Sequence, residues 1–260
     1  MIFQEKADDV EMAARAVTTK LLKGYLPGRP VVIKPNIVEP LPPPVTTGVR
    51  VIKGVITALR ESGIAEIIIA EGSGTGDTTD NFRQLGFQDL GVELVDLDKE
   101  HTVTLSVSAH RVWKEIIIPE ILLDKFIISV PVLKEHSLCG VTISLKNMVG
   151  ILPAEHYSGY WTYKKSMIHK ENPHGCIADI IRVLHPDWAI VDATTGMKGS
   201  HISGTPVHPP INLVYGSADP LEADIYGCAL LGKNWKDIPY LRMIAADQNR
   251  EDLSPAFCSQ

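Results

Sequence analysis

The feature that most constrains the fold of this chain is the alternation of short apolar segments with longer amphipathic segments. Several of the short segments are apolar at consecutive positions, which is typical of strands that are covered on both faces. The predicted strands are Val31–Lys34, Glu66–Ala70, Glu93–Asp96, His101–Val107, Glu115–Ile118, Lys125–Val130, Ala189–Asp192 and Asn212–Tyr215.

Amphipathic segments between these strands predict helices. Val49–Ser62 carries apolar residues at helical spacing, and Gly63 follows where a C-terminal cap belongs. Asp179–Leu184 and Pro220–Leu231 show the same pattern, and proline is favoured at the first position of a helix. Strands and helices in succession predict an α/β fold with a mixed, mostly parallel sheet, helices on both faces and Rossmann-like layering.

The size and composition of the chain are those of a globular protein. Its 260 residues are 45% hydrophobic and 22% charged, which suffices for a substantial core. The proline-rich segment Glu39–Val45 lies between a predicted strand and a predicted helix, so it is a surface connection rather than a linker. We therefore expect a single α/β domain over residues 1–260.

Charge and hydropathy exclude two classes of partner. A net charge of −6 argues against nucleic acid, which binds to basic surfaces. The short basic segment Lys164–Lys170 is most simply a solvated loop. The longest apolar segments, such as Phe126–Leu133, are too short to cross a membrane, so we expect no membrane partner.

The cysteines and the first residues indicate a cytoplasmic location. No basic segment leads into an apolar one at the N-terminus, so we expect no export signal. Cys139, Cys176, Cys228 and Cys258 show no Cys-x-x-Cys spacing, and reduced, unpaired thiols are typical of the cytoplasm. The sequence contains no iron–sulfur cluster motif.

Polar and glycine-rich segments follow several predicted strands. In α/β sheets, ligands bind at the carboxyl ends of the strands, where loops open and helices begin. Glycines in residues 71–77 allow backbone N–H groups to approach an anion, although a flexible turn explains this segment equally well. The predicted substrate-binding residues from these strand ends are Lys34, Asn36, Glu71, Gly72, Ser73 and Gly74.

Residues 134–150 follow a strand that is too apolar to be exposed. A lysine at the end of such a strand needs an anion or a cleft, and a histidine can transfer protons near neutral pH. We predict Lys134, His136 and Lys146 as catalytic residues, with Thr142 and Asn147 orienting the substrate. In the alternative interpretation both lysines extend to solvent and His136 caps a helix.

This segment resembles the signature of the domain-of-unknown-function family 362. In that family Lys-x-His is followed by Gly-Val-Thr and then by Leu-Lys-Asn-x-x-Gly. Lys-Pro-Asn at 34–36 and Glu-Gly-Ser-Gly at 71–74 also resemble the family, and the resemblance extends from about Val31 to Leu231. The matching positions of the signature are Lys134, His136, Gly140, Val141, Thr142, Leu145, Lys146, Asn147 and Gly150, and later ones are Asp192, Gly196, Met197, Gly199 and Gly204.

The resemblance identifies a family and implies little about activity. Some members carry a fused iron–sulfur ferredoxin segment, whose cysteine series is absent from this sequence. His136 and Lys146 are also similar in order and spacing to residues of the nickel-dependent lactate racemase family, in which the lysine anchors an organometallic cofactor. The glycine pair that precedes the lysine in that family is replaced here by Ser144 and Leu145.

Several histidines lie in two predicted loops that follow the Lys134–Gly150 segment. Neutral imidazoles together with a carboxylate suit zinc, iron or nickel. The sequence therefore predicts a divalent metal bound by His169, His201 and Asp192, while each histidine alone is most simply a surface residue.

Three functions are compatible with these features. The first is an enzyme that acts on a small anionic molecule at the strand-end cleft, assisted by a metal. The second is a non-catalytic protein that binds an anion, a metal or a cofactor. The third is an accessory subunit that depends on a redox partner. A homodimer is compatible with each of them.

Overall fold

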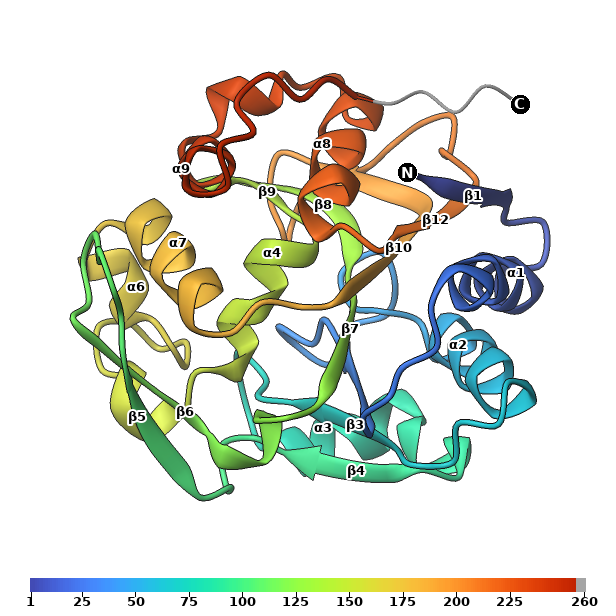
Figure 1. The fold of residues 1–260 in the computed structure, drawn as a ribbon, viewed down its shortest axis with the longest axis horizontal. Helices are drawn as coiled ribbons and strands as arrows, with labels where there is room; N and C mark the ends of the chain where they lie inside the picture. Colours follow the sequence, from blue (N-terminus) through green and yellow to red (C-terminus); the bar gives the residue numbers. More distant parts are fainter. Residues whose placement is uncertain (256–260) are drawn as a thin grey trace.

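The computed structural model describes residues 1–255. It shows a mixed α/β fold around a large, mostly parallel sheet, as the sequence predicts (Figure 1). Its main strands are β1 (Phe3–Lys6), β2 (Val31–Pro35), β3 (Ile67–Glu71), β4 (Glu93–Asp96), β7 (Phe126–Val130), β10 (Trp188–Lys198) and β12 (Leu213–Ser217).

The order of strands in the sheet is β1-β12-β10-β7-β2-β3-β4. Strands β10, β7, β2, β3 and β4 are parallel, whereas β12 pairs antiparallel with β10, and β1 pairs antiparallel with β12. The edge of the sheet that holds the parallel carboxyl ends therefore collects residues from segments far apart in the sequence.

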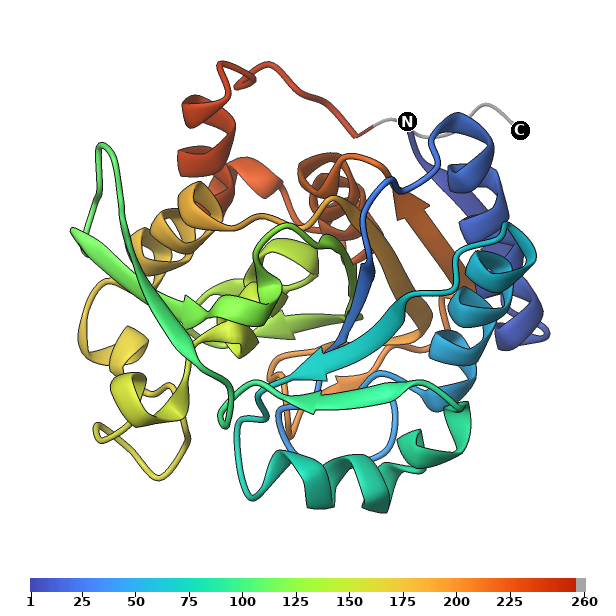
Figure 2. The same ribbon diagram turned by 60° about the horizontal axis from the view of Figure 1, so that its bottom comes forward.

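The sheet is covered by helices on both faces. The helices are α1 (Val10–Gly24), α2 (Val49–Glu61), α3 (Thr78–Leu85), α4 (Ser144–Asn147), α5 (Ala154–Tyr157), α6 (Met167–Lys170), α7 (Pro173–Val183), α8 (Pro220–Leu230) and α9 (Pro239–Asp247). Helices α1 and α2 cover one face, and α4, α7 and α8 cover the other (Figures 1 and 2). Among residues 1–255, no helix is long and apolar enough to span a bilayer.

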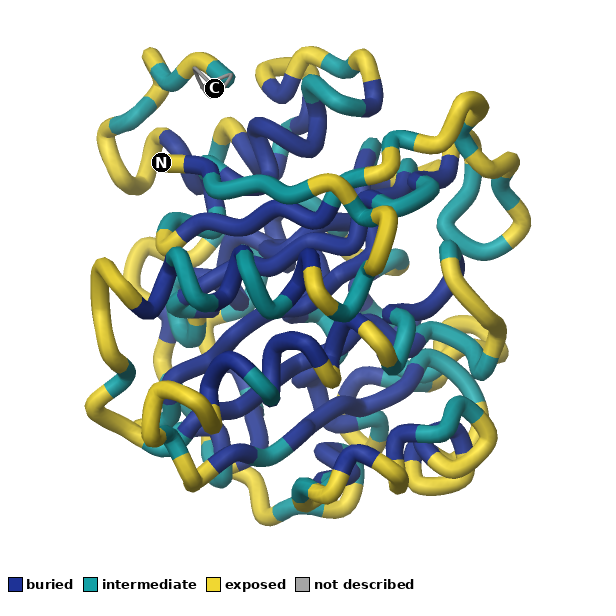
Figure 3. Tube along the Cα trace, turned by 90° about the vertical axis from the view of Figure 1, so that its right-hand side faces the viewer, coloured by how far each residue is buried: buried dark blue, intermediate teal, exposed yellow. Residues whose placement is uncertain are grey.

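Alternate residues of each central strand face opposite layers. In β2, Val31 and Ile33 pack against α1 and α2, whereas Val32 faces the other layer. This two-sided burial explains why the strand is apolar at consecutive positions. Figure 3 shows the result, with buried residues concentrated in the central strands and exposed ones in the connecting loops.

A short hairpin extends the sheet at the carboxyl end of β7. Strand β8 (Val132–His136) follows β7 after one residue, pairs in parallel with β10, and pairs antiparallel with β9 (Gly140–Thr142). Strand β10 in turn pairs with the two-residue strand β11 (Thr205–Pro206). A separate sheet consists of β5 (Thr102–Ser106) and β6 (Glu115–Pro119).

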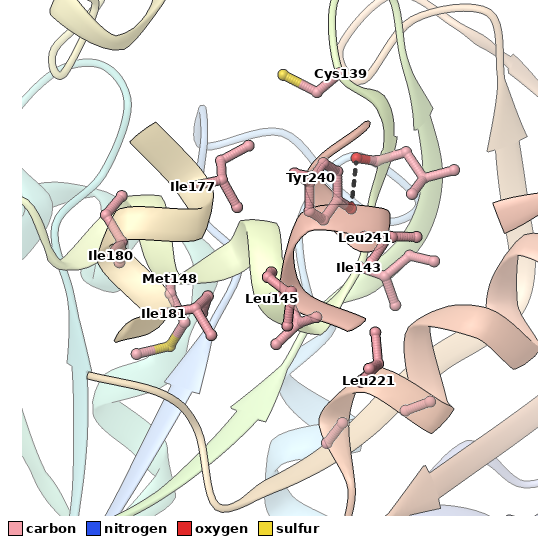
Figure 4. Close-up of a cluster of buried hydrophobic side chains, with 14 of the residues drawn as sticks. Cys139, Ile143, Leu145, Met148, Ile177, Ile180, Ile181, Leu221, Tyr240 and Leu241 are labelled. Atoms are coloured by element: carbon pink, nitrogen blue, oxygen red, sulfur yellow. Dashed lines mark hydrogen bonds between the residues drawn. The ribbon is translucent and has the colours of Figure 1, made fainter. Parts of the chain in front are cut away.

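Helix α4 is only four residues long, and its surroundings hold it in place. Leu145 and Met148 are buried among side chains of α7, α8 and α9 (Figure 4). The hydroxyl group of Tyr240 in α9 donates to the carbonyl oxygen of Val141, the bond drawn there as a dashed line. At the start of α4, the carboxylate of Asp224 accepts the N–H groups of Ser144 and Leu145 at 2.8 and 3.1 Å.

The helices predicted from the sequence differ from the structure in their bounds and in their number. The helix predicted at Asp179–Leu184 begins earlier, at Pro173, where Asn172 caps it. Helix α1 was not predicted; half of its buried face consists of the small or polar side chains Ala13, Ala14 and Thr18, which weaken the apolar pattern of Val17, Leu21 and Leu22.

Candidate functional site

A cavity of about 570 Å³ lies at the carboxyl ends of β2, β3 and β8. It is lined by most of the residues that the sequence predicts to bind substrate or perform catalysis. These lining residues are Lys34, Asn36, Glu71, Gly72, Gly74, His136, Thr142, Lys146 and Asn147.

Lys34 and Glu71 form a buried ion pair at the ends of β2 and β3. The lysine Nζ lies 2.9 and 3.0 Å from the two carboxylate oxygens. Burial lowers the pKa of Lys34 and raises that of Glu71, and the charge of each partner opposes the shift of the other. Glu71 also accepts the N–H groups of Gly72 and Ile37, so its carboxylate is saturated by its neighbours.

Asn147 connects this pair to the rest of the site. Its amide oxygen accepts from Asn36 Nδ2 at 3.0 Å and from Lys34 Nζ at 3.3 Å. Its amide nitrogen donates to Ser129 Oγ at 3.0 Å and to the carbonyl oxygen of Pro35. The side chain of Asn147 is therefore a fixed structural bridge rather than a free ligand-binding group.

Two glycines allow the charged groups to approach the backbone. A Cβ atom at Gly150 would lie 2.2 Å from Glu71 Oε1 and 2.6 Å from Lys34 Nζ. A Cβ atom at Gly72 would lie 2.6 Å from Lys165 Nζ. Larger side chains at either position would displace the ion pairs, which gives the Glu-Gly and Asn-x-x-Gly motifs a packing explanation.

The sequence did not predict a second cluster of charged side chains near the cavity, which consists of Asp98, Lys164 and Lys165. Lys165 is 4% exposed, and its Nζ lies 2.9 Å from one oxygen of Asp98, while Lys164 Nζ lies 3.0 Å from the other. The interpretation of this basic segment as a solvated loop was therefore wrong for Lys165. Asp98 follows β4 after one residue, so only the strand order of the sheet could have indicated its place.

Lys134 is buried and is not among the residues that line the cavity. Its Nζ donates to the backbone carbonyl oxygen of Val45 at 2.6 Å, and its side chain is fully buried. Burial, together with repulsion by Lys146, lowers the pKa of Lys134 to about 7. This lysine thus meets neither an anion nor the cavity, in contrast to the sequence-based expectation.

His136 is held in one tautomer by the turn between β8 and β9. Its Nδ1 atom accepts the N–H groups of Leu138 and Cys139, each at 3.2 Å. Both bonds require a lone pair on Nδ1, so the ring proton of the neutral imidazole is on Nε2. Burial and the charge of Lys146 further lower the pKa of His136 far below its usual value.

Lys146 in α4 is the most unusual group of the site. It is 8% exposed and lines the cavity, yet its Nζ forms no hydrogen bond or ion pair with any residue between 1 and 255. Burial lowers its pKa, and the thiol of Cys139, rather than a carboxylate of residues 1–255, opposes this effect. Four further side-chain atoms of cavity-lining residues are buried without a partner among the described residues: Asn36 Oδ1, Thr142 Oγ1, His169 Nδ1 and His201 Nδ1.

Three histidines and a tryptophan stack along the cavity. The ring centroids of His136 and His201 are 4.0 Å apart, those of His136 and His169 are 6.1 Å apart, and those of His169 and Trp161 are 5.0 Å apart. Burial and the charge of Lys146 lower the pKa of His169 to about 4 and that of His201 to about 3. All three imidazoles are therefore neutral at pH 7.

The residues predicted to bind a metal do not form one group. His169 and His201 line the cavity, whereas Asp192 does not. The Asp192 carboxylate instead accepts the N–H and hydroxyl groups of Thr194 at 3.0 and 2.7 Å. Over residues 1–255, no three His, Cys, Asp or Glu side chains are arranged to hold a metal ion.

Two other predictions concern residues outside the cavity wall. The hydroxyl group of Ser73 donates to the carbonyl oxygen of Thr75 and lies 3.0 Å from the hydroxyl group of Thr78 at the start of α3, so Ser73 shapes the loop that carries Gly72 and Gly74. Cys139, Cys176 and Cys228 are buried free thiols, and Cys258 lies outside the described residues.

Comparison with known proteins identifies the family. No curated protein and no solved structure matches the chain. The family model of DUF362, a domain of unknown function, matches residues 31–229, a range that contains every residue of the cavity described above. On this match over most of its length, the chain belongs to the DUF362 family.

Proposed function

We propose that the cavity is the active site of an enzyme that acts on a small anionic molecule. The observation that carries this proposal is the amino group of Lys146, which is buried at the cavity without an acidic partner in the described part of the chain. A buried ammonium group is costly unless an anion lies next to it, and a bound substrate would supply that anion.

The other charges of the cavity support an anionic ligand. Glu71 is paired with Lys34, and Asp98 is paired with Lys164 and Lys165. Lysines of the protein itself therefore neutralise both carboxylates. The charged group of the cavity that remains without a partner among the described residues is the amino group of Lys146. Thr142 Oγ1 and the Nε2–H group of His136 add hydrogen-bond donors for an oxyanion.

The arrangement suits proton transfer next to an oxyanion. His136 donates a hydrogen bond from Nε2 and holds no proton at Nδ1, so it polarises an oxygen rather than exchanging protons. Burial lowers the pKa of Lys146, which favours the neutral amine as the group that accepts a proton from the substrate; the ammonium group that this transfer forms then pairs with the anionic group of the substrate. Asn147 and Asn36 keep the opposite wall rigid.

A titration with simple anions tests the binding part of this proposal. Isothermal calorimetry with acetate, pyruvate and inorganic phosphate should detect an anion that binds to the wild-type protein. Lys146→Met should weaken its binding by about 30-fold or more, since the lost contact is a buried charge pair. Lys170→Met, which removes an exposed lysine, is the matched control. Equal affinity of the wild-type protein and Lys146→Met would contradict the proposal.

A non-catalytic binding protein is the second candidate, and the fixed tautomer of His136 favours it because it removes one acid–base group. Exchange of substrate protons with D₂O, followed by NMR on pyruvate, separates the two candidates. Exchange that depends on Lys146 supports the enzyme, whereas binding without exchange supports the carrier.

A further inference from the structure

The wall of the cavity carries more positive than negative charge, although the whole chain has a net charge of −6. Among the described residues that line it, Glu71 is the acidic one, and the basic ones are Lys34, Lys146, Lys164 and Lys165. Lys34 neutralises Glu71, and Asp98, which does not line the cavity, neutralises one further lysine. When Lys146 is protonated, two positive charges of the wall are therefore left without a carboxylate of their own.

One of these charges lies at Asp98, whose single carboxylate is shared by two lysines. Lys165 Nζ lies 2.9 Å from one carboxylate oxygen, and Lys164 Nζ lies 3.0 Å from the other. Lys165 is 4% exposed, whereas the side chain of Lys164 is 27% exposed and lines the cavity. Because one carboxylate balances one ammonium group, the pair of lysines keeps a positive charge that a ligand can meet at Lys164.

The other charge is that of Lys146, and it lies in a different part of the cavity. Burial and the charge of Lys146 lower the pKa of His169 and of His201, so Lys146 lies on the histidine side. Lys165 instead reaches Asp98 and the carbonyl oxygen of Ser73, which follow β4 and β3.

The electrostatics of the lysines agree with this separation. Burial, and to a smaller extent repulsion by Lys164, lowers the pKa of Lys165. Neither of these two lysines contributes to the lowered pKa of Lys146. The cavity thus has two basic positions that lie apart from one another.

We propose that the ligand of this cavity carries two separate anionic groups, of which a dicarboxylate is the simplest form. One group meets Lys146 and the other meets Lys164, and the cavity volume of about 570 Å³ suffices for a chain of several atoms between them. The proposal rests on the proposed function, because its first anionic group is the one at Lys146. It adds a second charge to the substrate and names the side chain that binds it.

Calorimetry with the full chain and dicarboxylates of increasing length tests this class. Succinate, glutarate and adipate are each compared with their monoamides, which have nearly the same size and shape but a single negative charge. We expect at least one dicarboxylate to bind about tenfold more tightly than its own monoamide, because a second charge pair adds to the first. Inorganic phosphate, which carries its charges on one centre, should not match the tightest dicarboxylate.

Variants of Lys164 connect this preference to one side of the cavity. Lys164→Met leaves Asp98 paired with Lys165, so the fold keeps its buried ion pair while the additional charge is lost. This variant should remove most of the advantage of the dicarboxylate over its monoamide, and Lys164→Arg should retain it. Lys170→Met, which removes an exposed lysine that does not line the cavity, is the control and should behave as the wild-type protein does.

The outcomes separate this inference from the proposed function. If the monoamides bind through Lys146 but none of the three dicarboxylates exceeds its monoamide, the class with two anionic groups is wrong and the anion site stands. An advantage of the dicarboxylate that survives in Lys164→Met would overturn the assignment of the second group to this lysine. If no probe depends on Lys146, both proposals are wrong.

Discussion

The Nδ1 atom of His136 accepts the backbone N–H group of Cys139 at 3.2 Å. The N–H group of Leu138 shares the same acceptor, so the turn between β8 and β9 uses the imidazole as an internal cap. Protonation of Nδ1 would break both hydrogen bonds, because the new N–H group would face the two backbone N–H groups. The residue that the sequence predicts as a proton-transfer group is thus held by its own turn as a donor at Nε2.

The tautomer of His136 is directly measurable. In long-range ¹H–¹⁵N NMR spectra, we expect the Nε2–H form to persist from about pH 5 to about pH 8, because burial and Lys146 lower the pKa of the ring. In urea, the histidines should instead titrate near pH 6.5, about the value for an unfolded chain. Appearance of the Nδ1–H form or of the imidazolium in the folded protein would contradict the geometry.

The ion pair between Lys34 and Glu71 predicts a non-additive effect on stability. Lys34→Met leaves Glu71 buried without its partner, which should lower the free energy of unfolding by about 3–5 kcal/mol. Lys34→Met combined with Glu71→Leu removes both charges and should recover part of this loss. Urea denaturation of the single and double variants measures the coupling, and additive losses would show that the two groups do not interact.

Gly150 and Gly24 form a matched pair for testing close packing. A Cβ atom at Gly150 would lie 2.2 Å from Glu71 Oε1, whereas one at Gly24, at the end of α1, meets nothing within 4 Å. We expect Gly150→Ala to lower the free energy of unfolding by about 1–3 kcal/mol. Gly24→Ala should leave it unchanged or raise it slightly. Similar unfolding midpoints for the two variants would contradict this expectation. They would mean that the Glu71 side chain can move away from the added methyl group at little cost in stability.

The sequence predicts the part of the cavity wall that contains Lys34 and Glu71, because these residues lie at the ends of strands. Lys34 and Glu71 each occupy the last positions of an apolar strand, and parallel strands end at a common edge. Their proximity therefore follows from the fold class once β2 and β3 are neighbours in the sheet. Residues 134–150 reach the same edge of the sheet, because β8 follows β7, and β7 lies between β2 and β10.

The positions of Lys165 and Asp192 depend on contacts that sequence patterns do not encode. Lys165 is buried because a loop folds back onto Asp98, more than sixty residues earlier in the chain. Asp192 was predicted to end a strand, but β10 continues to Lys198, and the Asp192 side chain accepts hydrogen bonds from Thr194, two residues away. Side-chain direction and loop path decide both cases, and neither follows from the type of residue.

Lys134 gives a prediction about pH and stability. Burial and repulsion by Lys146 lower its pKa from 10.5 to about 7 in the folded protein. Between these two values the unfolded chain binds a proton that the folded protein does not bind. The free energy of unfolding should therefore increase as the pH rises through this window, by at most about 1.4 kcal/mol per pH unit for this group.

Replacement of the lysine isolates this contribution. Lys134→Met should flatten the increase in stability between about pH 7 and about pH 10 relative to the wild-type protein, as measured by urea denaturation at several pH values. Lys170→Met is the control, because this lysine is exposed. If the curves of Lys134→Met and wild type run parallel, Lys134 keeps its proton in the folded state. The carbonyl oxygen of Val45 would then suffice to hold a buried ammonium group.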